Sequence, residues 1–290
     1  NYTNPMSMLM WFFSQAHPHI QAVGLCHSVQ NTAREIASYI GVGHDRLIYE
    51  CAGINHSAWM TRLEIDGGDA YPLLRAAAGD PDIYARDKVR FELMRHLGYF
   101  VTETSEHNAE YTPYFLKDDA LVERYEIPVD EYIRRSEENL RAYVAIRRKL
   151  LTGESFPLGP SVEYAASIIH SVVTGTPGLI HGNVRNTGLI ANLPEGCCVE
   201  VPVLVSRTGL SSCHAEPLPP QLAAMCLPHV AVQELVVRAA REGCRDHIYH
   251  AAMLDRHAPS VLSLDDIQAM VDDLLEAHGD ALPEGVRRRS

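Results

Sequence analysis

The spacing of apolar residues changes several times along the chain and predicts short strands alternating with longer helices. Between Ser28 and Gly41 the apolar residues recur every three or four positions, which is typical of an amphipathic helix that begins at a capping serine and ends at a glycine. The short apolar segment before it, residues 22–26, fits a strand. A strand, a tight loop and a helix in this order indicate an α/β arrangement.

The same patterns predict the remaining elements of the chain. Strands are expected at residues 47–54, 59–65, 179–193 and 198–205. Helices are expected at residues 6–17, 71–78, 87–97, 130–151, 161–174, 221–241, 246–254 and 263–278. Residues 102–115 are polar and aromatic without either period, so we expect an irregular loop there.

Composition and charge narrow the class of protein. The chain has 290 residues, 46% of them apolar, which allows one large domain or two small ones. Its formal charge of −12 argues against nucleic-acid binding and against an anionic membrane surface. No apolar run approaches the roughly 20 residues of a membrane span. Seven cysteines form no disulfide framework, which favours reduced thiols and a cytoplasmic location.

The first five residues are informative as well. Asn1-Tyr2-Thr3-Asn4-Pro5 is typical of a strand that ends in a sharp turn, and not of the start of a protein. We therefore expect a fragment or a natural truncation. A glycine pair at Gly41 and Gly43 follows a helix and lacks a third glycine, so it predicts a helix end and not a phosphate-binding loop.

Cys26 and His56 are the strongest candidates for a metal site. Each lies at the end of a predicted strand, and Cys26 also precedes a helix N-terminus, where the dipole favours a thiolate. A thiolate and an imidazole suit a borderline divalent ion and leave positions for substrate oxygens. The alternative is structural, because buried cysteines are commonly small apolar fillers and most histidines form only hydrogen bonds.

Three further groups of residues carry candidate chemistry. His27 lies beside Cys26 and would act as an acid or orient a substrate, or else face water at a helix start. The predicted loop holds six candidate side chains, for which a solvated rim is the alternative: Glu103, Glu106, His107, Glu110, Tyr111 and Tyr114. Arg185 stands between two glycines in residues 181–188, where it would clamp a hydroxylated or anionic ligand or belong to a plain turn.

Five segments in order resemble glycoside hydrolase family four, most closely its α-galactosidases of the melibiase type. The likeness covers nearly the whole chain, and Cys-His-Ser-Val-Gln and Ala-Gly-Ile-Asn-His are its most specific parts. The segments are Asn4-Pro5-Met6, residues 23–30 (Val-Gly-Leu-Cys-His-Ser-Val-Gln), residues 51–56 (Cys-Ala-Gly-Ile-Asn-His), residues 105–111 (Ser-Glu-His-Asn-Ala-Glu-Tyr) and residues 183–188 (Asn-Val-Arg-Asn-Thr-Gly).

The resemblance implies a redox elimination that uses NAD and a divalent metal, commonly Mn²⁺. A hydride leaves sugar carbon 3, a base removes the carbon 2 proton, the glycosidic oxygen leaves carbon 1, water adds and the hydride returns. By resemblance Cys26 and His56 are the metal ligands, and Tyr111 is the base, with Tyr114 as the alternative. Asn4 binds the sugar beside the cofactor. His27 contacts the leaving group or the sugar.

The resemblance also predicts the architecture and the partners. The fold class is α/β with α+β character: a lactate/malate-dehydrogenase-like C-terminal domain that carries the end of a Rossmann-type sheet. Residues 1–45 would end the NAD-binding domain, whose glycine-rich part is absent, and residues 46–290 would form the catalytic and oligomerisation domain. The expected substrate is an α-galactoside such as melibiose, and the expected assembly is a homo-dimer or homo-tetramer.

Other functions stay open at this point. The same fold would also serve an α-glucoside or an α-glucuronide. A 6-phospho-glycoside is disfavoured because the sequence shows no strong basic pocket motif beyond Arg185. A relative of the 2-hydroxy-acid dehydrogenases shares an Asn-Pro after a strand but needs no metal ligands. A truncated, catalytically silent paralogue is the third alternative.

Overall fold

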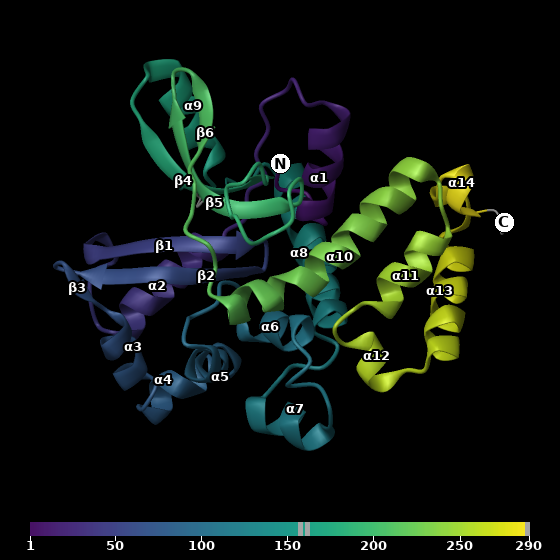
Figure 1. Ribbon diagram of the computed structural model, residues 1–290, viewed down its shortest axis with the longest axis horizontal. Coiled ribbons are helices and arrows are strands. Elements are labelled where there is room, and N and C mark those ends of the chain that lie inside the picture. Colours follow the sequence, from purple (N-terminus) through teal and green to yellow (C-terminus); the bar gives the residue numbers. More distant parts are fainter. Residues whose placement is uncertain (156–158, 160–162, 288–290) are drawn as a thin grey trace.

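The sheet at the centre of the protein is antiparallel and is surrounded by helices (Figure 1). The computed structural model describes residues 1–155, 159 and 163–287. Within these residues the sheet has six strands in the order β3-β2-β1-β5-β4, and β6 pairs with β5. The strands are β1 Leu47–Ile54, β2 Ser57–Ile65, β3 Gly68–Asp69, β4 Gly178–Arg185, β5 Cys198–Ser206 and β6 Gly209–Ser212. The predicted α/β class with α+β character is confirmed.

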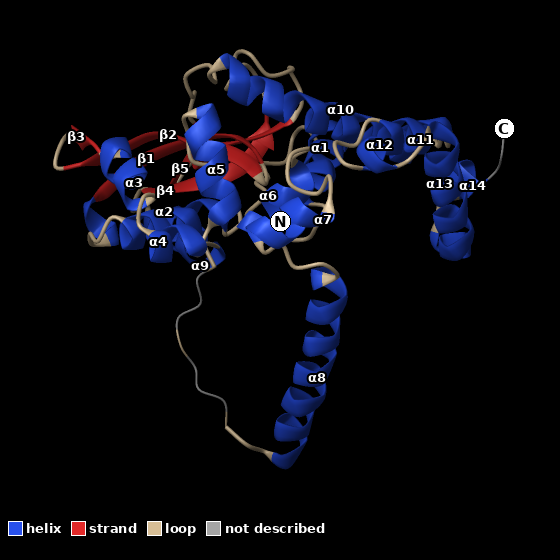
Figure 2. Cartoon of the chain, turned by 90° about the horizontal axis from the view of Figure 1, so that it is seen from below, coloured by secondary structure: helices blue, strands red, loops and turns tan. Residues whose placement is uncertain are grey.

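Helices cover the sheet and extend away from it on two sides (Figures 1 and 2). In Figure 1, α2 to α5 lie below the β1–β2 hairpin, and α10 runs from the sheet toward the C-terminal helices. The helices are α1 Met6–Ala16, α2 Ser28–Tyr39, α3 Tyr71–Ala77, α4 Pro81–Ala85, α5 Lys88–Leu97, α6 Ser105–Tyr111, α7 Asp119–Tyr125, α8 Glu131–Thr152, α9 Ala165–Thr174, α10 Pro220–Glu242, α11 Asp246–Met253, α12 Ala258–Val261, α13 Leu264–His278 and α14 Glu284–Arg287, with short 3-10 turns at His44–Arg46 and Gly279–Ala281.

Two antiparallel ribbons, β1–β2 and β4–β5, cross at one point of the sheet. The only residue pair joining β1 to β5 is Gly53 with Glu200. Gly53 has φ +150°, and a Cβ there would lie 2.6 Å from the carbonyl oxygen of Ser57 and 2.7 Å from Cα of Ala58. Glycine is therefore required where the hairpin folds back on itself before the crossing.

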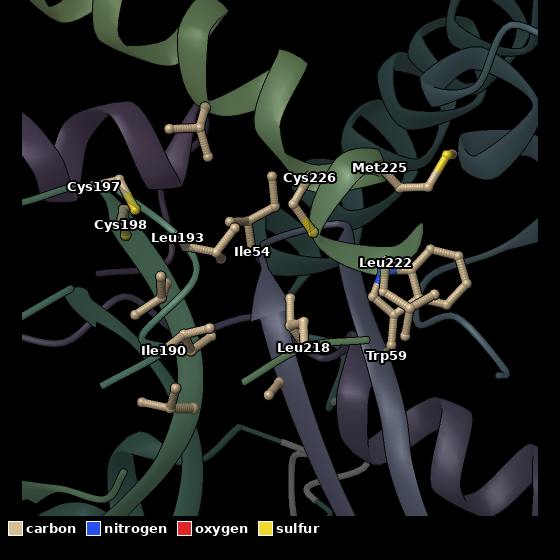
Figure 3. Packing of buried hydrophobic residues seen from close by; sticks show 14 of the residues in the cluster. Ile54, Trp59, Ile190, Leu193, Cys197, Cys198, Leu218, Leu222, Met225 and Cys226 are labelled. Atoms are coloured by element: carbon tan, nitrogen blue, oxygen red, sulfur yellow. The ribbon is translucent and has the colours of Figure 1, made fainter. Parts of the chain in front are cut away.

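The larger hydrophobic core lies between α10 and this crossing. Leu222 and Cys226 of α10 pack toward Ile54 and Trp59 of the β1–β2 hairpin (Figure 3). Trp59 is 1% exposed, and burial of a large apolar side chain stabilises a fold by roughly 1.5–3 kcal/mol. The Cys226 thiol also donates a hydrogen bond of 3.3 Å to the carbonyl oxygen of Ser57. This helix therefore fixes the turn that joins β1 to β2.

A buried charge network fixes the start of α6. Arg90 on α5 forms ion pairs with Asp87 and with Glu35 of α2, the latter at 2.6 Å. Asp87 also accepts hydrogen bonds from the hydroxyls of Tyr39, at 3.0 Å, and of Ser105, at 2.5 Å. Because its partners satisfy the buried arginine, the network ties α2, α5 and the first residue of α6 together.

Three of the predicted elements differ in the structure. Residues 22–26 form no strand, and Gly24 makes an isolated bridge to Asn183. On the other side of the segment, the backbone N–H of Leu25 donates to the carbonyl oxygen of Asn1. The strand predicted at residues 179–193 ends at Arg185, where the buried Asn186 amide donates to the carbonyl oxygens of Ile190, at 3.1 Å, and Leu193, at 3.0 Å. These side-chain bonds replace a strand ladder.

The predicted irregular loop at residues 102–115 is the third difference, because it contains helix α6. The Thr104 side chain accepts a hydrogen bond of 3.4 Å from the backbone N–H of His107 and caps this helix. Only Asn108 and Ala109 of α6 are buried, so the segment shows no apolar period. The predicted cap Ser161 lies outside the described residues, and α9 begins at Ala165.

Helix α10 is the one helix among the described residues that is long and apolar enough to cross a membrane by length and composition. It packs against β1, β2 and α11, and 44% of its most apolar window is buried inside the fold. Packing against several elements and burial of an apolar window are typical of the central helix of a globular domain.

Candidate active site

Three side chains from distant segments converge above the strand crossing. Cys26 follows the extended segment, His56 lies in the β1–β2 turn, and Glu103 precedes α6. The Nε2 atom of His56 lies 3.6 Å from the Cys26 Sγ and 3.3 Å from a Glu103 carboxylate oxygen. One ligand atom from each of the three residues lies within 4.8 Å of the other two. We call these residues the Cys-His-Glu cluster.

The backbone of two cluster members is unusual. His56 has φ +64° and Glu103 has φ +72°, both in the left-handed region that non-glycine residues rarely adopt. Each such conformation costs roughly 1 kcal/mol or more, and it persists only where the surrounding structure imposes it. The fold therefore holds both side chains toward one point at a cost in stability.

The donor set of the Cys-His-Glu cluster fits a divalent cation. Ligands bound at roughly 2.0–2.3 Å to one ion stand about 3–4 Å apart, as the atoms here do. Thiolate, imidazole and carboxylate together suit Mn²⁺, Zn²⁺ and similar borderline ions. The side chains of His56 and Glu103 are mostly buried but keep 13% and 15% of their surface exposed, which leaves an open side for a substrate.

Tyr111, the last residue of α6, lies beside the cluster. Its ring is 5.7 Å from that of His56 and 5.2 Å from that of His229 on α10, between ring centroids. Burial raises the pKa of Tyr111, and the negative charges of Glu103 and Glu110 raise it further. A cation bound at the cluster acts in the opposite direction, because it favours the tyrosinate.

The structure separates Tyr111 from its alternative, Tyr114. The Tyr114 hydroxyl donates to the sulfur of Met225 at 3.6 Å, and the side chain is 43% exposed. No described contact joins Tyr114 to the cluster. Of the two tyrosines, Tyr111 is therefore the one that lies beside the Cys-His-Glu cluster.

His27 lies next to Cys26 but faces another partner. Its Nε2 atom is 2.9 Å from a carboxylate oxygen of Glu163, and its ring stacks on Tyr2 with centroids 5.6 Å apart. Asn4 is exposed and follows in the same segment, where its side-chain oxygen accepts the backbone N–H of Met6 at 3.3 Å. No described contact joins Asn4 to the Cys-His-Glu cluster, whereas His27 is adjacent to Cys26 in sequence.

Arg185 does not join the cluster in the structure. It lines a separate pocket of about 290 Å³ together with Trp11, Gln15, Glu195 and Glu234. The pocket lies between α1 and the second half of α10, so the structure does not bring Arg185 together with Cys26 and His56.

A buried carboxyl group, Glu200 of β5, lies at the strand crossing beneath the site. The residue is 0% exposed, and one carboxyl oxygen accepts a hydrogen bond of 3.1 Å from the Asn183 amide. Burial raises the pKa of Glu200 to about 8, and the charge of Cys26 contributes to the same shift. Its other oxygen has no partner among the described residues. The carboxyl group is therefore protonated at neutral pH.

Comparison with known proteins assigns the chain to a family. The family model described as "Family 4 glycosyl hydrolase C-terminal domain" matches residues 51–258, and that described as "Family 4 glycosyl hydrolase" matches residues 1–42. The chain belongs to glycosyl hydrolase family 4. This membership favours a glycosyl hydrolase over the 2-hydroxy-acid dehydrogenase alternative.

Two curated relatives of this family 4 chain are α-galactosidases. The chain is 41% identical to that of Bacillus subtilis (strain 168) over 98% of its own length and 66% of the relative's. It is 30% identical to that of Rhizobium meliloti (strain 1021) over 98% of its own length and 60% of the relative's. The chain thus spans less than two thirds of the length of these relatives.

A solved structure of a 6-phospho-α-glucosidase from gut microorganisms, in complex with NAD and Mn²⁺, shares the fold. Its TM-score is 0.78 at 20% identity, and the match covers 98% of this chain and 67% of that one. The fold of that glucosidase therefore extends over 98% of this chain.

Four residues of this family 4 chain lie at or near the site although the sequence did not single them out as metal ligands or site residues. Glu103 was expected only as part of a polar loop, and Glu163, His229 and Glu200 were not candidates. His229 follows Pro228 inside the apolar helix α10, and such an interruption is the signal that marks it. Glu200 is the only acidic residue in the apolar strand β5, which is a comparable signal. Glu103 and Glu163 carry no distinguishing local signal.

Proposed function

We propose that the chain is the metal- and sugar-binding part of an NAD- and Mn²⁺-dependent α-galactosidase. The observation that carries this proposal is the Cys-His-Glu cluster with Tyr111 beside it, in a chain of family 4. The two relatives that are 41% and 30% identical to the chain are α-galactosidases, which supports the choice of sugar.

Cys26 and His56 are the proposed metal ligands, with Glu103 as a third donor or as a partner that orients His56. A divalent ion at this place would polarise two neighbouring sugar hydroxyls and stabilise negative charge that develops on them. Tyr111 is the proposed base for the proton on sugar carbon 2. The imidazole of His27, held by Glu163, is proposed to bind the sugar or to protonate the leaving oxygen.

NAD is proposed as the cofactor of the complete protein. The described residues include no strand, glycine-rich turn and helix in succession, so they do not form a dinucleotide site by themselves. We propose that residues 1–45 end the NAD-binding domain, with Asn4 beside the cofactor, and that residues 46–290 form the catalytic domain. This division is supported by the two family models, because the match to the first ends at residue 42 and the match to the second begins at residue 51.

The charges near the site favour a neutral sugar. Glu103 belongs to the cluster, and Glu163 lies against His27, so two carboxylates would repel the acid group of a uronate or a 6-phosphate. Arg185, which was expected to hold an anionic or hydroxylated ligand, lines another pocket. We therefore propose α-galactosides such as melibiose, with α-glucosides as the alternative, and a cytoplasmic homo-dimer or homo-tetramer.

The substrate assignment is tested by hydrolysis in the complete native protein with NAD⁺, Mn²⁺ and a reductant. The nitrophenyl α-galactoside, α-glucoside and α-glucuronide are compared by kcat/KM. We expect the galactoside to be preferred over the glucoside and the glucuronide to be the poorest substrate. Preference for the glucuronide would contradict the charge argument, and no turnover of any substrate would indicate a silent paralogue.

A further inference from the structure

Helix α6 does not hold Tyr111 in place by itself. The helix has seven residues, of which only Asn108 and Ala109 are buried. A helix this short is marginally stable in water unless other elements pack against it. Tyr111 is its last residue, and the chain continues in extended conformation at Thr112. The position of the phenol ring therefore depends on contacts from other elements.

Three imidazole rings lie around the ring of Tyr111. Their centroids are 5.7 Å away for His56, 6.5 Å for His107 and 5.2 Å for His229. His107 belongs to α6 itself, whereas His56 lies in the β1–β2 turn and His229 on α10. The shortest of the three ring contacts thus comes from α10, the central helix of the fold.

The imidazole of His229 also forms a hydrogen bond with the backbone of Tyr111. Burial lowers the pKa of His229, and the charge of Arg256 lowers it further, so the imidazole is neutral at pH 7 and has one N–H. The bond to Tyr111 acts in the opposite direction on this pKa, which makes the imidazole the donor and the Tyr111 carbonyl oxygen the acceptor. The last carbonyl groups of a helix lack partners within the helix, so His229 caps the end of α6.

One turn of α10 contacts both sides of the site. Cys226 and His229 are three residues apart, which places them on the same face of the helix. The Cys226 thiol donates to the carbonyl oxygen of Ser57, the residue that follows His56, while His229 binds Tyr111 (Figure 3). The same rigid turn therefore fixes the segment that carries His56 and the end of the helix that carries Tyr111.

We propose that His229 is a positioning residue that holds the ring of Tyr111 beside His56. It fixes the end of α6 through the Tyr111 carbonyl group and the phenol ring through the ring contact. No described hydrogen bond joins His229 to the phenol hydroxyl, so its role is to place Tyr111 and not to take its proton. The consequence for catalysis rests on the proposed function, in which Tyr111 is the base.

The first test measures how far water reaches the Tyr111 ring. The full chain is labelled with fluorotyrosine, the Tyr111 signal is assigned with Tyr111→Phe, and its fluorine solvent isotope shift between H₂O and D₂O is measured. We expect a small shift in the wild type and, in His229→Leu, a shift that approaches that of Tyr132, which is 84% exposed. His229→Asn and His229→Gln keep an amide donor near the positions of Nδ1 and Nε2, and one of them should restore the wild-type shift.

His247 provides the matched control. It is half-buried on α11, its Nε2 lies 3.1 Å from a carboxylate oxygen of Glu242, and no described contact joins it to Tyr111. His247→Leu should therefore leave the Tyr111 shift unchanged, and both leucine variants should keep the wild-type circular dichroism. His229→Ala repeats the removal of the imidazole if His229→Leu does not fold.

The second test measures exchange of the sugar carbon 2 proton in the complete protein with NAD⁺ and Mn²⁺. We expect His229→Leu to slow the exchange about 10-fold or more, because a small misplacement of a reacting group has a large effect on rate. Mn²⁺ affinity should stay at the wild-type value, since His229 is not in the Cys-His-Glu cluster. The amide variant that restores the isotope shift should also restore the exchange.

The two tests distinguish a failure of the positioning role from a failure of the proposed function. An unchanged Tyr111 isotope shift in His229→Leu would overturn the proposal, and so would a failure of both amide variants to restore the wild-type shift. A raised shift together with normal proton exchange would support the positioning role of His229 and contradict the assignment of Tyr111 as the base.

Discussion

At the scale of single residues, the site contains residues whose backbone conformation or burial is energetically unfavourable. His56 and Glu103 occupy left-handed backbone conformations, and Glu200 is a carboxyl group buried with one partner. Tyr111 is held beside His56 with a raised pKa. A cation bound at the Cys-His-Glu cluster would offset the charge of Glu103 and act against the rise in the pKa of Tyr111.

Tyr111→Phe should stop exchange of the sugar carbon 2 proton with solvent, because it removes the proposed base. We expect a loss of about 100-fold or more, the usual effect of removing a general base. The exchange is followed by nuclear magnetic resonance in the complete protein with NAD⁺ and Mn²⁺. Tyr114→Phe is the matched control and should exchange normally, and the reverse result would assign the base to Tyr114.

Glu103→Gly should separate stability from metal binding. Glycine adopts the φ of +72° without steric cost, so the free energy of unfolding without metal should rise by about 1 kcal/mol. Metal affinity should fall about tenfold or more through loss of the carboxylate. Chemical denaturation and titration calorimetry measure the two quantities, and Glu103→Gln should lower affinity without raising stability. A less stable glycine variant would contradict the strain argument.

Glu200 predicts a pH dependence of stability. Its folded pKa of about 8 lies above the ordinary value of 4.5, so the folded state keeps a proton that the unfolded state loses. The contribution of Glu200 to stability should therefore fall as pH rises from 4.5 to 8. Glu200→Gln imitates the protonated form and should be more stable than wild type at pH 9 by on the order of 3 kcal/mol, with no gain at low pH.

Two residues serve as controls for the Glu200 measurement. Glu195 is exposed, so Glu195→Gln should leave the pH profile unchanged. His181, with its pKa lowered by burial to about 4, is already neutral in both states above pH 7 and adds nothing there. An identical high-pH slope in the Glu200→Gln and wild-type proteins would show that Glu200 is not the titrating group.

At the scale of elements, regular apolar periods identified most helices and strands, and local hydrogen bonding decided the exceptions. The helix at residues 28–39 and the strand at 47–54 have clear periods and were predicted correctly. Helix α6 has two buried residues and a threonine cap, so no period was present to find. The Asn186 side chain ends β4 early by donating to backbone carbonyl oxygens four and seven residues later, and the apolar pattern of the segment does not reveal these bonds.

The crossing of the two ribbons gives a prediction at this scale. Gly53→Ala should destabilise the fold by about 2–4 kcal/mol, because its Cβ would meet backbone atoms that cannot move aside. Gly67→Ala, in the β2–β3 turn with φ +82° and open space around it, should cost only about 1 kcal/mol. Thermal unfolding measures both, and equal costs would contradict the steric argument.

At the scale of the whole molecule, the site is assembled from segments far apart in sequence. Cys26, His56 and Tyr111 could be proposed as site residues from their positions and from the family resemblance. Glu103 was a candidate only as one of six side chains of a polar loop, and Glu163 was not a candidate, because acidic residues in polar segments are most often solvated. The exposure of every residue of α8 was also beyond prediction, since an amphipathic pattern normally indicates a face that packs within the same chain.

The most direct test of the account is binding of Co²⁺, as a spectroscopic substitute for Mn²⁺, to the purified chain. A cysteine ligand produces a thiolate-to-cobalt charge-transfer band in the near ultraviolet, so binding and ligand identity are read together. We predict one bound ion per chain with this band. Cys26→Ser should lose the band, whereas Cys213→Ser, at a half-exposed cysteine elsewhere, should keep it. A Cys26→Ser chain that binds Co²⁺ with the full band would contradict the metal site on which the proposed function depends.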